Sequence, residues 1–207
     1  MAKITALRET KGRDRVNLFL DGKFAFSLSA DLVSSRNLQC DQSLTDEEID
    51  SLAKSYLYQR CLMVATNFLS YRPRSTSELR IKLKRRGFDE ETQARVLESL
   101  KEKGLLDEAA FAEFWTDNRE SFSPRSRWLT RIELQKKGVS KDVIERAVES
   151  IDDTDSAYRA ASSRLRSIRW SDHEEFRRRL GGYLQRRGFG YSVISATLQR
   201  LWNETKQ

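Results

Sequence analysis

The sequence predicts a mainly α-helical protein made of tandem three-helix-bundle repeats in an elongated, curved stack, with a small N-terminal β-hairpin or β-ribbon. Three observations support this fold class. A short motif recurs three times, with its glycines 51 and then 50 residues apart. Apolar residues at helical spacing follow each copy, and an Asp-Gly pair separates two alternating segments near the N-terminus. Self-similarity at so long a period indicates a unit that stacks on copies of itself, because one copy cannot bury its apolar face alone.

The recurring motif, called here glycine motif 1, 2 or 3, has the form of a helix C-terminus. Its copies are Leu83–Phe88, Leu134–Val139 and Leu184–Phe189. If each glycine adopts the left-handed conformation just past a helix, the leucine and the residue after the glycine pack together, as in a Schellman motif. The basic residues lie in the last turn, where the helix dipole favours a cation by roughly 0.3–1 kcal/mol. Helix capping alone therefore explains the motif.

Residues 1–44 are expected to form a β-ribbon followed by a short helix. Val16–Leu20 and Phe24–Leu28 have alternating patterns on either side of Asp21-Gly22. Alternation around Asp-Gly is the strongest short-range indication of a β-hairpin. A lone hairpin is only marginally stable in water. The ribbon should therefore either cover the first helices, which we favour, or act as a docking surface.

The rest of the chain divides into three repeats. Residues 45–108 comprise an opening helix and the first repeat, residues 109–156 the second, and residues 157–207 the third. The opening helix begins with capping-box spacing at Thr45 and Glu48. We expect it to continue into the first repeat without a flexible linker.

The middle helix of each repeat has its own predicted start. The start residues are Ser75 with Glu78, Ser123 with Pro124, and Ser171 with Glu174. The first and third pairs have capping-box spacing, and the second is an N-cap followed by proline in the first turn. Gly181-Gly182 falls inside the last middle helix, at a cost of roughly 1 kcal/mol each relative to alanine. Either this helix bends there or a neighbouring backbone comes close.

Positive charge is concentrated at the C-terminal end. The chain is 33% charged and 38% hydrophobic, with a formal net charge of +7. Residues 157–207 hold 11 Lys/Arg against 4 Asp/Glu, whereas residues 1–50 hold 7 against 9. A basic excess on one part of a chain favours a polyanionic partner. A solvated arginine-rich face explains the same pattern equally well.

Several function classes are disfavoured. The sequence contains no run of 18 apolar residues, so a membrane-spanning helix is not expected. The N-terminus lacks the apolar core of a signal peptide. The two cysteines, Cys40 and Cys61, have no metal-ligand spacing. The single histidine, His173, is expected to face solvent, and no nucleophile set or phosphate loop is present. We therefore expect a cytoplasmic protein that is not an enzyme and uses no cofactor or metal.

A helix-turn-helix protein that binds specific DNA sequences is a more specific functional alternative, because each glycine motif joins two predicted helices. The second helix would begin with Asp89-Glu90-Glu91 in the first repeat and with Ser140-Lys141-Asp142 in the second. Carboxylates at these positions would face phosphates. Sequence-specific recognition is therefore disfavoured, whereas non-specific phosphate binding through the third repeat is not.

An ordered set of motifs covers about residues 50–204. They are Arg72-Pro73-Arg74-Ser75 with Glu78-Leu79 and Leu83, Gly87-Phe88, Gly104-Leu105-Leu106-Asp107-Glu108 with Phe111-Ala112, Glu133-Leu134 with Lys137-Gly138, and Arg186-Arg187-Gly188-Phe189. Together these residues resemble the RecX family, bacterial regulatory proteins that modulate the RecA recombinase. The chain departs from the family pattern at Glu108, where a second Asp is common, and at Gly181-Gly182.

The resemblance implies a stack of three-helix repeats that lies along the groove of the RecA filament on single-stranded DNA. In that groove it would inhibit filament growth, ATPase, strand exchange and co-protease activity, and so modulate recombination, DNA repair and the SOS response. The partners implied are RecA, single-stranded DNA and also duplex DNA, and we expect a monomer. The alternative function is non-sequence-specific DNA binding, mainly through the basic third repeat.

We expect ten basic residues to contact the partner or DNA. They are Lys84, Arg85, Arg86, Lys136, Lys137, Arg177, Arg178, Arg179, Arg186 and Arg187.

Overall fold

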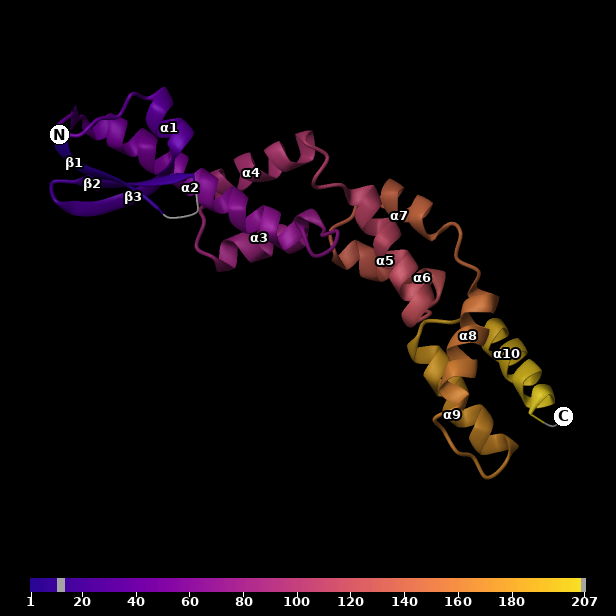
Figure 1. The fold of residues 1–207 in the computed structure, drawn as a ribbon. Coiled ribbons are helices and arrows are strands. Elements are labelled where there is room, and N and C mark those ends of the chain that lie inside the picture. The colour runs from indigo at the N-terminus through magenta and orange to yellow at the C-terminus, as the bar shows by residue number, and fades with distance from the viewer. Residues whose placement is uncertain (11–13, 206–207) are drawn as a thin grey trace. The chain divides into compact units, whose positions relative to one another are not determined.

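The structure is a computed structural model, and it describes residues 1–10 and 14–205 (Figure 1). Contacts divide the chain into two compact units. The first unit comprises Met1–Tyr71 and Arg80–Lys103, and the second comprises Arg72–Leu79 and Gly104–Gln207. The predicted fold class is confirmed in that three tandem three-helix groups follow a small antiparallel sheet.

The N-terminal sheet has four strands in the order β3-β2-β1-β4, and its neighbouring strands are antiparallel. The strands are β1 (Ala2–Glu9), β2 (Arg15–Leu20), β3 (Lys23–Ser29) and β4 (Ser43–Leu44). The predicted hairpin is confirmed between β2 and β3. Asp21 has φ 49° and Gly22 has φ 79°. A two-residue type I′ turn requires positive φ at both of its central residues.

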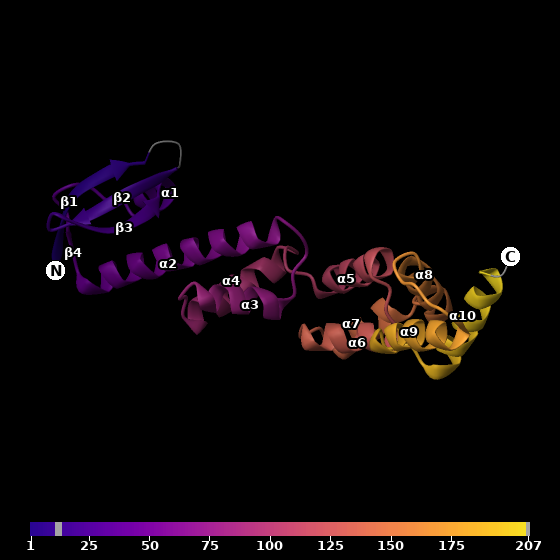
Figure 2. The ribbon, with the colours of Figure 1, turned by 90° about the horizontal axis from the view of Figure 1, so that it is seen from below.

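The sheet packs against two helices, α1 (Ala30–Ser35) and α2 (Asp46–Leu69). Figure 2 shows the sheet beside the first turns of α2. The predicted capping box is confirmed: the Glu48 amide donates to Thr45 Oγ1 at 3.2 Å, and the Thr45 amide donates to Glu48 Oε2 at 2.8 Å. The shared core consists of Ile4, Leu18, Phe26, Leu28, Leu38, Leu44 and Leu52. The favoured packing role of the ribbon is therefore observed.

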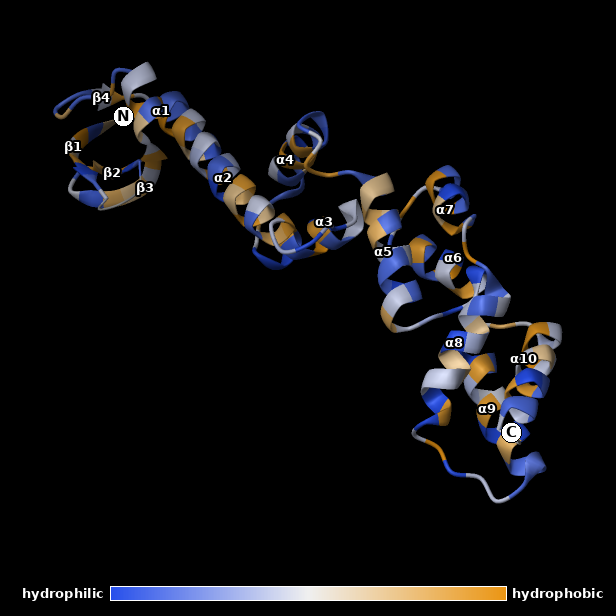
Figure 3. Ribbon diagram, turned by 45° about the vertical axis from the view of Figure 1, so that its right-hand side comes forward, coloured by the Kyte–Doolittle hydropathy of each residue, from blue (hydrophilic) through white to orange (hydrophobic). Residues whose placement is uncertain are grey.

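Three helices make up each repeat, and α2 runs unbroken into the first of them. The remaining helices are α3 (Thr76–Arg85), α4 (Glu90–Glu102), α5 (Glu108–Phe122), α6 (Arg127–Lys136), α7 (Lys141–Val148), α8 (Asp153–Leu165), α9 (His173–Arg186) and α10 (Tyr191–Glu204). Hydrophobic residues gather where α8, α9 and α10 face one another (Figure 3). The core of this last bundle includes Phe176, Leu180, Leu184 and Leu198.

All three glycine motifs end their helices as predicted. Gly87, Gly138 and Gly188 have φ of 81°, 76° and 83°. In motif 2 the Val139 amide donates to Leu134 O at 3.2 Å and the Gly138 amide donates to Gln135 O at 2.9 Å. Motifs 1 and 3 repeat both bonds. These are the two hydrogen bonds of a Schellman motif.

Two of the predicted helix starts are wrong. The N-cap of α6 is the buried Ser126, whose Oγ accepts from the Leu129 amide at 3.1 Å, and Ser123 instead ends α5. The N-cap of α9 is Asp172, which accepts from the Glu175 amide at 2.8 Å. In both cases a better-placed side-chain oxygen close by satisfies the free amides of the first turn.

Gly181-Gly182 lies inside α9, and the helix continues through both residues. A Cβ on Gly181 would lie 3.5 Å from Leu198 Cδ1 and 3.8 Å from Ile194 Cγ2, both on α10. Both are side-chain atoms at ordinary van der Waals distance, so the structure does not show the expected close approach of a neighbouring backbone.

The glycine motifs also join neighbouring repeats within the second unit. Motif 2 lies against the first turn of α3: a Cβ on Gly138 would lie 3.2 Å from Ser77 Cβ. Motif 3 lies against the first turn of α6: a Cβ on Gly188 would lie 2.6 Å from Ser126 Oγ and 2.7 Å from Leu129 Cβ. Motif 1 has no such neighbour among residues 1–10 and 14–205, where a Cβ on Gly87 would meet nothing within 4 Å.

We expect Gly188→Ala to destabilise the protein more than Gly87→Ala does. Both alanines would occupy a left-handed conformation, at about 1–2 kcal/mol. Only the alanine at 188 also overpacks a repeat junction, which adds about 1–3 kcal/mol. Urea unfolding of both variants measures the difference in free energy of unfolding. If both variants lose the same free energy of unfolding, the junction accommodates the added methyl group without destabilisation.

Candidate partner-binding surface

The ten predicted contact residues divide into two groups. Eight are exposed, whereas Lys137 and Arg187, the last basic residues of motifs 2 and 3, are half-buried. The exposed residues are Lys84, Arg85, Arg86, Lys136, Arg177, Arg178, Arg179 and Arg186. The two half-buried residues make contacts within the chain.

Lys137 binds the first turn of α3. Its Nζ lies 2.5 Å from Glu78 Oε1 and 4.6 Å from the centre of the Trp115 ring. Arg72 Nη2 donates to the same Glu78 oxygen at 3.2 Å. Burial acts to raise the pKa of the Glu78 carboxyl, but hydrogen bonds from Lys137 and Arg72 outweigh it and hold this pKa below its ordinary value. Lys137 is thus an internal ion-pair partner.

Arg187 makes the corresponding contact with the segment before α6. Its Nη1 donates to Ser123 Oγ at 3.0 Å and to Pro124 O at 2.8 Å. The Ser126 amide donates to Arg187 O at 3.1 Å. The guanidinium also lies over the Tyr183 ring, 4.6 Å from its centre. Arg187 therefore joins the third repeat to the second.

Two further carboxylates hold basic side chains inside the second unit. Glu120 accepts from Ser156 Oγ at 2.9 Å and pairs with Arg159, which links α5 to α8. Glu133 accepts from Trp115 Nε1 at 2.9 Å and from Arg119 Nε at 2.7 Å, and it pairs with Arg125. These links were not predicted from the sequence, because no local spacing distinguishes such acids from surface ones.

Three of the exposed residues come together in an arginine pocket of about 330 Å³ on the third repeat. Its lining is Arg164, Ile168, Arg178, Arg179, Tyr183 and Arg186. Arg179 and Arg186 share a face of α9 with Tyr183 because they lie four and three residues from it, and Arg178 lines the same pocket next to Arg179. A Cβ on Gly182 would lie 3.5 Å from Arg186 Nη1, so the missing side chain leaves room for this guanidinium along the helix.

A carboxylate at the start of α9 balances part of this charge. Glu175 Oε1 lies 2.6 Å from Arg179 Nη2 and 3.6 Å from Arg178 Nη2. Hydrogen bonds from Ser171, followed by the one from Arg179, lower the pKa of Glu175 to about 2. Arg164 and Arg186 have no carboxylate within ion-pair distance among the described residues. The pocket therefore keeps a positive excess and suits a phosphate or carboxylate group.

Arg177 lies apart from the pocket. It lines a second hollow with Asp172, His173 and Glu174, and Arg178 lines both hollows. His173 is exposed as expected, and its ring centre also lies 4.4 Å from that of Trp202. Lys136 and the three exposed residues of motif 1 line other parts of the surface. Arg164 and Tyr183 are not among the predicted contact residues, although Tyr183 lies at helical spacing from Arg179 and Arg186 and is therefore expected beside them.

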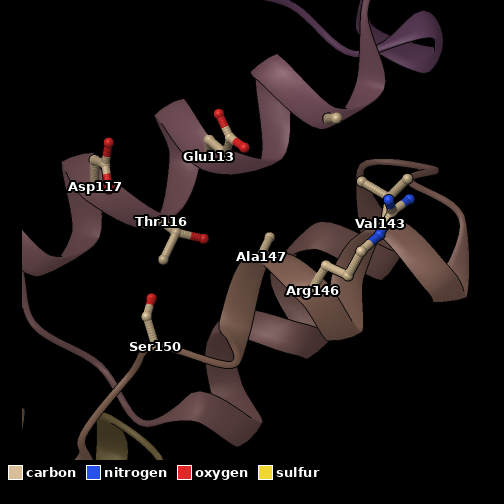
Figure 4. Close-up of a pocket in the computed structure, with 8 residues that line it drawn as sticks. Glu113, Thr116, Asp117, Val143, Arg146, Ala147 and Ser150 are labelled. Carbon is tan, nitrogen blue, oxygen red and sulfur yellow. The ribbon is translucent and has the colours of Figure 1, made fainter.

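The second repeat has a pocket of about 250 Å³ between α5 and α7. Glu113, Thr116 and Asp117 on α5 line it together with Arg146 and Ala147 on α7, and Figure 4 shows Thr116 on the side of α5 towards Ala147 and Ser150. Its charges are mixed, and it contains none of the ten predicted residues. Within residues 1–10 and 14–205, no group of His, Cys, Asp or Glu could hold a metal ion. Over the same residues, no helix is long and apolar enough to cross a membrane.

Comparison with known proteins places these features in a family. The chain matches models of the regulatory protein RecX N-terminal domain over residues 2–45 and of the first, second and third three-helix domains of RecX over residues 61–100, 107–148 and 151–198. It is 30% identical over 209 residues to the regulatory protein RecX of Clostridium botulinum strain Eklund 17B, covering 98% of both chains. The chain belongs to the RecX family.

Two solved RecX structures share the fold. One crystal structure of regulatory protein RecX covers 94% of the chain with a TM-score of 0.70 at 23% identity. The crystal structure of RecX from Lactobacillus salivarius covers 70% of the chain with a TM-score of 0.57 at 21% identity. The sequence-based recognition of the family is confirmed, and with it a regulatory class of protein.

We expect Glu78→Gln to lower the free energy of unfolding at pH 7 by roughly 1.5–3 kcal/mol, because charged hydrogen bonds to Lys137 and Arg72 are lost. Glu145→Gln is the matched control. Glu145 pairs with Arg131 on the surface and is 45% exposed, so its loss should cost about 0–1 kcal/mol.

The same pair of variants gives a pH test. Because the pKa of Glu78 is lowered by folding, its contribution is complete above its ordinary pKa and is lost as pH falls through the folded value. The gap between wild type and Glu78→Gln should therefore shrink from pH 6 to pH 3. A gap that stays constant would contradict the assigned ion pair.

Proposed function

We propose that this RecX-family protein regulates the RecA recombinase by binding its filament on single-stranded DNA. In this proposal the protein lies in the filament groove in the cytoplasm and inhibits filament growth, ATPase, strand exchange and co-protease activity. Recombination, DNA repair and the SOS response would be modulated as a result. The observation that carries the proposal is the full-length match to RecX proteins over all four domains.

The distribution of basic residues supports this role. Lys137 and Arg187 hold repeats together, so we propose that contact with the filament is made by the eight exposed residues. The arginine pocket is the strongest of these contacts, because its cations converge on one hollow. A filament surface offers both carboxylates and DNA phosphates, and guanidinium groups bind either with paired hydrogen bonds.

We expect the protein to lower the rate of ATP hydrolysis by RecA on single-stranded DNA when present at well below one molecule per recombinase. One bound molecule that blocks growth affects many recombinase subunits, so excess DNA should not restore the rate of ATP hydrolysis. The double variant Arg178→Glu/Arg186→Glu should lose most of this inhibition. Arg169→Glu, an exposed change in the same repeat outside the pocket, should keep it. An unchanged rate with the wild-type protein would refute the proposed function.

A second candidate function is non-sequence-specific DNA binding through the third repeat. The observation that favours it is the aromatic ring of Tyr183 within the arginine pocket, since exposed aromatic and cationic groups together bind single strands. Arg164 already lies 5.7 Å from the centre of that ring.

This second function predicts a strong dependence on salt. For single strands the logarithm of the binding constant falls with the logarithm of salt concentration by about 0.7 per phosphate contact. Four arginines would give a slope of roughly −3. Fluorescence anisotropy with a labelled oligonucleotide measures it, and a slope near zero would exclude this function.

A further inference from the structure

In the second unit, two of the glycine motifs pack against another part of the chain. In both junctions the motif receives the N-terminal turn of a preceding middle helix. Gly138 faces Ser77, the second residue of α3, and Gly188 faces Trp128, the second residue of α6. The last basic residue of the motif then binds acceptors in the first turn of that helix or in the segment just before it. Lys137 binds Glu78, and Arg187 binds Ser123 and Pro124.

Only the last basic residue of the motif has this role. The residue before it is Lys136 in motif 2 and Arg186 in motif 3. Both are exposed, and in the described residues neither makes a hydrogen bond or ion pair with the preceding repeat. Two adjacent cations on one helix end therefore have different roles, one at the junction and one outside it.

Motif 1 has the same geometry without an occupant. Its cap is complete, since Gly87 has φ 81° and the Phe88 amide donates to Leu83 O at 3.4 Å. The space beside Gly87 is open, whereas the equivalent space is filled at Gly138 and Gly188. Arg86, which corresponds to Lys137 and Arg187, is exposed, and its guanidinium makes no hydrogen bond or ion pair with any described residue.

We propose that motif 1 is a docking site for the N-terminal turn of a helix on a protein partner, with a carboxylate in that turn bound by Arg86. The occupant follows from the two internal junctions, whose glycine motifs have the same sequence pattern and the same helix cap as motif 1. Charge complementarity also supports it. The C-terminal end of a helix is partially negative and the N-terminal end of another is partially positive, so the two ends attract.

The same dipole disfavours nucleic acid at this place. Phosphates approaching motif 1 would meet the carbonyl end of α3, where anions are repelled. A helix start carrying Asp or Glu offers both a positive dipole end and an acceptor for the guanidinium. This inference rests on the proposed function, which makes the recombinase the partner that supplies the helix.

Arg86→Glu and Arg85→Glu form a matched pair that tests the site. Both reverse one charge on neighbouring exposed residues, and only Arg86 has the junction role. The protein can be labelled at the exposed Cys40, because Cys61 is buried and burial raises its pKa to about 11. Binding is then titrated against RecA filaments formed on single-stranded DNA with a slowly hydrolysed ATP analogue.

We expect Arg86→Glu to weaken filament binding about tenfold or more, and Arg85→Glu by no more than about threefold. Equal losses would mean general electrostatic attraction and would overturn the inference while leaving the proposed function standing. A parallel loss of affinity for naked single-stranded DNA by Arg86→Glu alone would identify nucleic acid as the occupant and also overturn it. If the wild-type protein fails to bind the filament, the proposed function falls and this site falls with it.

Arg86→Lys provides an independent measurement, because it reproduces the chemistry of the Lys137–Glu78 pair. Treatment of the complex with a carbodiimide joins a lysine to a carboxylate that it contacts. We expect mass spectrometry to find residue 86 coupled to an Asp or Glu in the first turn of a recombinase helix. Arg85→Lys should give little of this product. Coupling elsewhere, or equal coupling from both variants, would contradict the proposed geometry.

Discussion

The left-handed glycine that ends each middle helix is the constraint on which the repeats depend. It closes the helix with two hydrogen bonds and turns the chain into the next helix. At Gly138 and Gly188 the absence of a side chain also lets the preceding repeat approach the backbone. Glycine at this position therefore ends the helix and also allows the contact between repeats. The same contact places the preceding basic residue within reach of its acceptor.

The junctions combine half-buried ion pairs with apolar cores. Removing two charges from water costs much of what their attraction returns, so such pairs stabilise less than their short distances suggest. Their geometry is specific, however, because Glu78, Glu120 and Glu133 each accept from more than one donor. We infer that apolar burial holds each bundle together. Glu78 and Glu120 fix how one repeat meets the next, whereas Glu133 holds α5 to α6 within the second repeat.

Local patterns predicted the fold well, because its elements are set by nearby residues. Helical periodicity, the Asp21-Gly22 turn and the glycine motifs act over a few positions. The roles of single basic residues were not predictable in this way. Lys137 meets Glu78 across 59 residues, and nothing near either one marks the pair. The starts at Ser126 and Asp172 were missed because several capping residues stand together, and only packing selects among them. The arginine pocket likewise needed α8 to bring Arg164 to α9.

The length of α9 has a consequence for how such an array can grow. It begins 15 residues before its glycine, whereas α3 and α6 begin 11 before theirs. Because α9 is one turn longer, its first turn lies in a different position, relative to the rest of its repeat, from the first turns of α3 and α6, on which glycine motifs 2 and 3 pack. A gene duplication that copies an internal repeat would reproduce a matching helix start and motif together. A duplication that adds a fourth repeat after the third would instead place the new glycine motif against the start of α9, which is longer than α3 and α6. Descendants of this architecture should therefore lengthen from within.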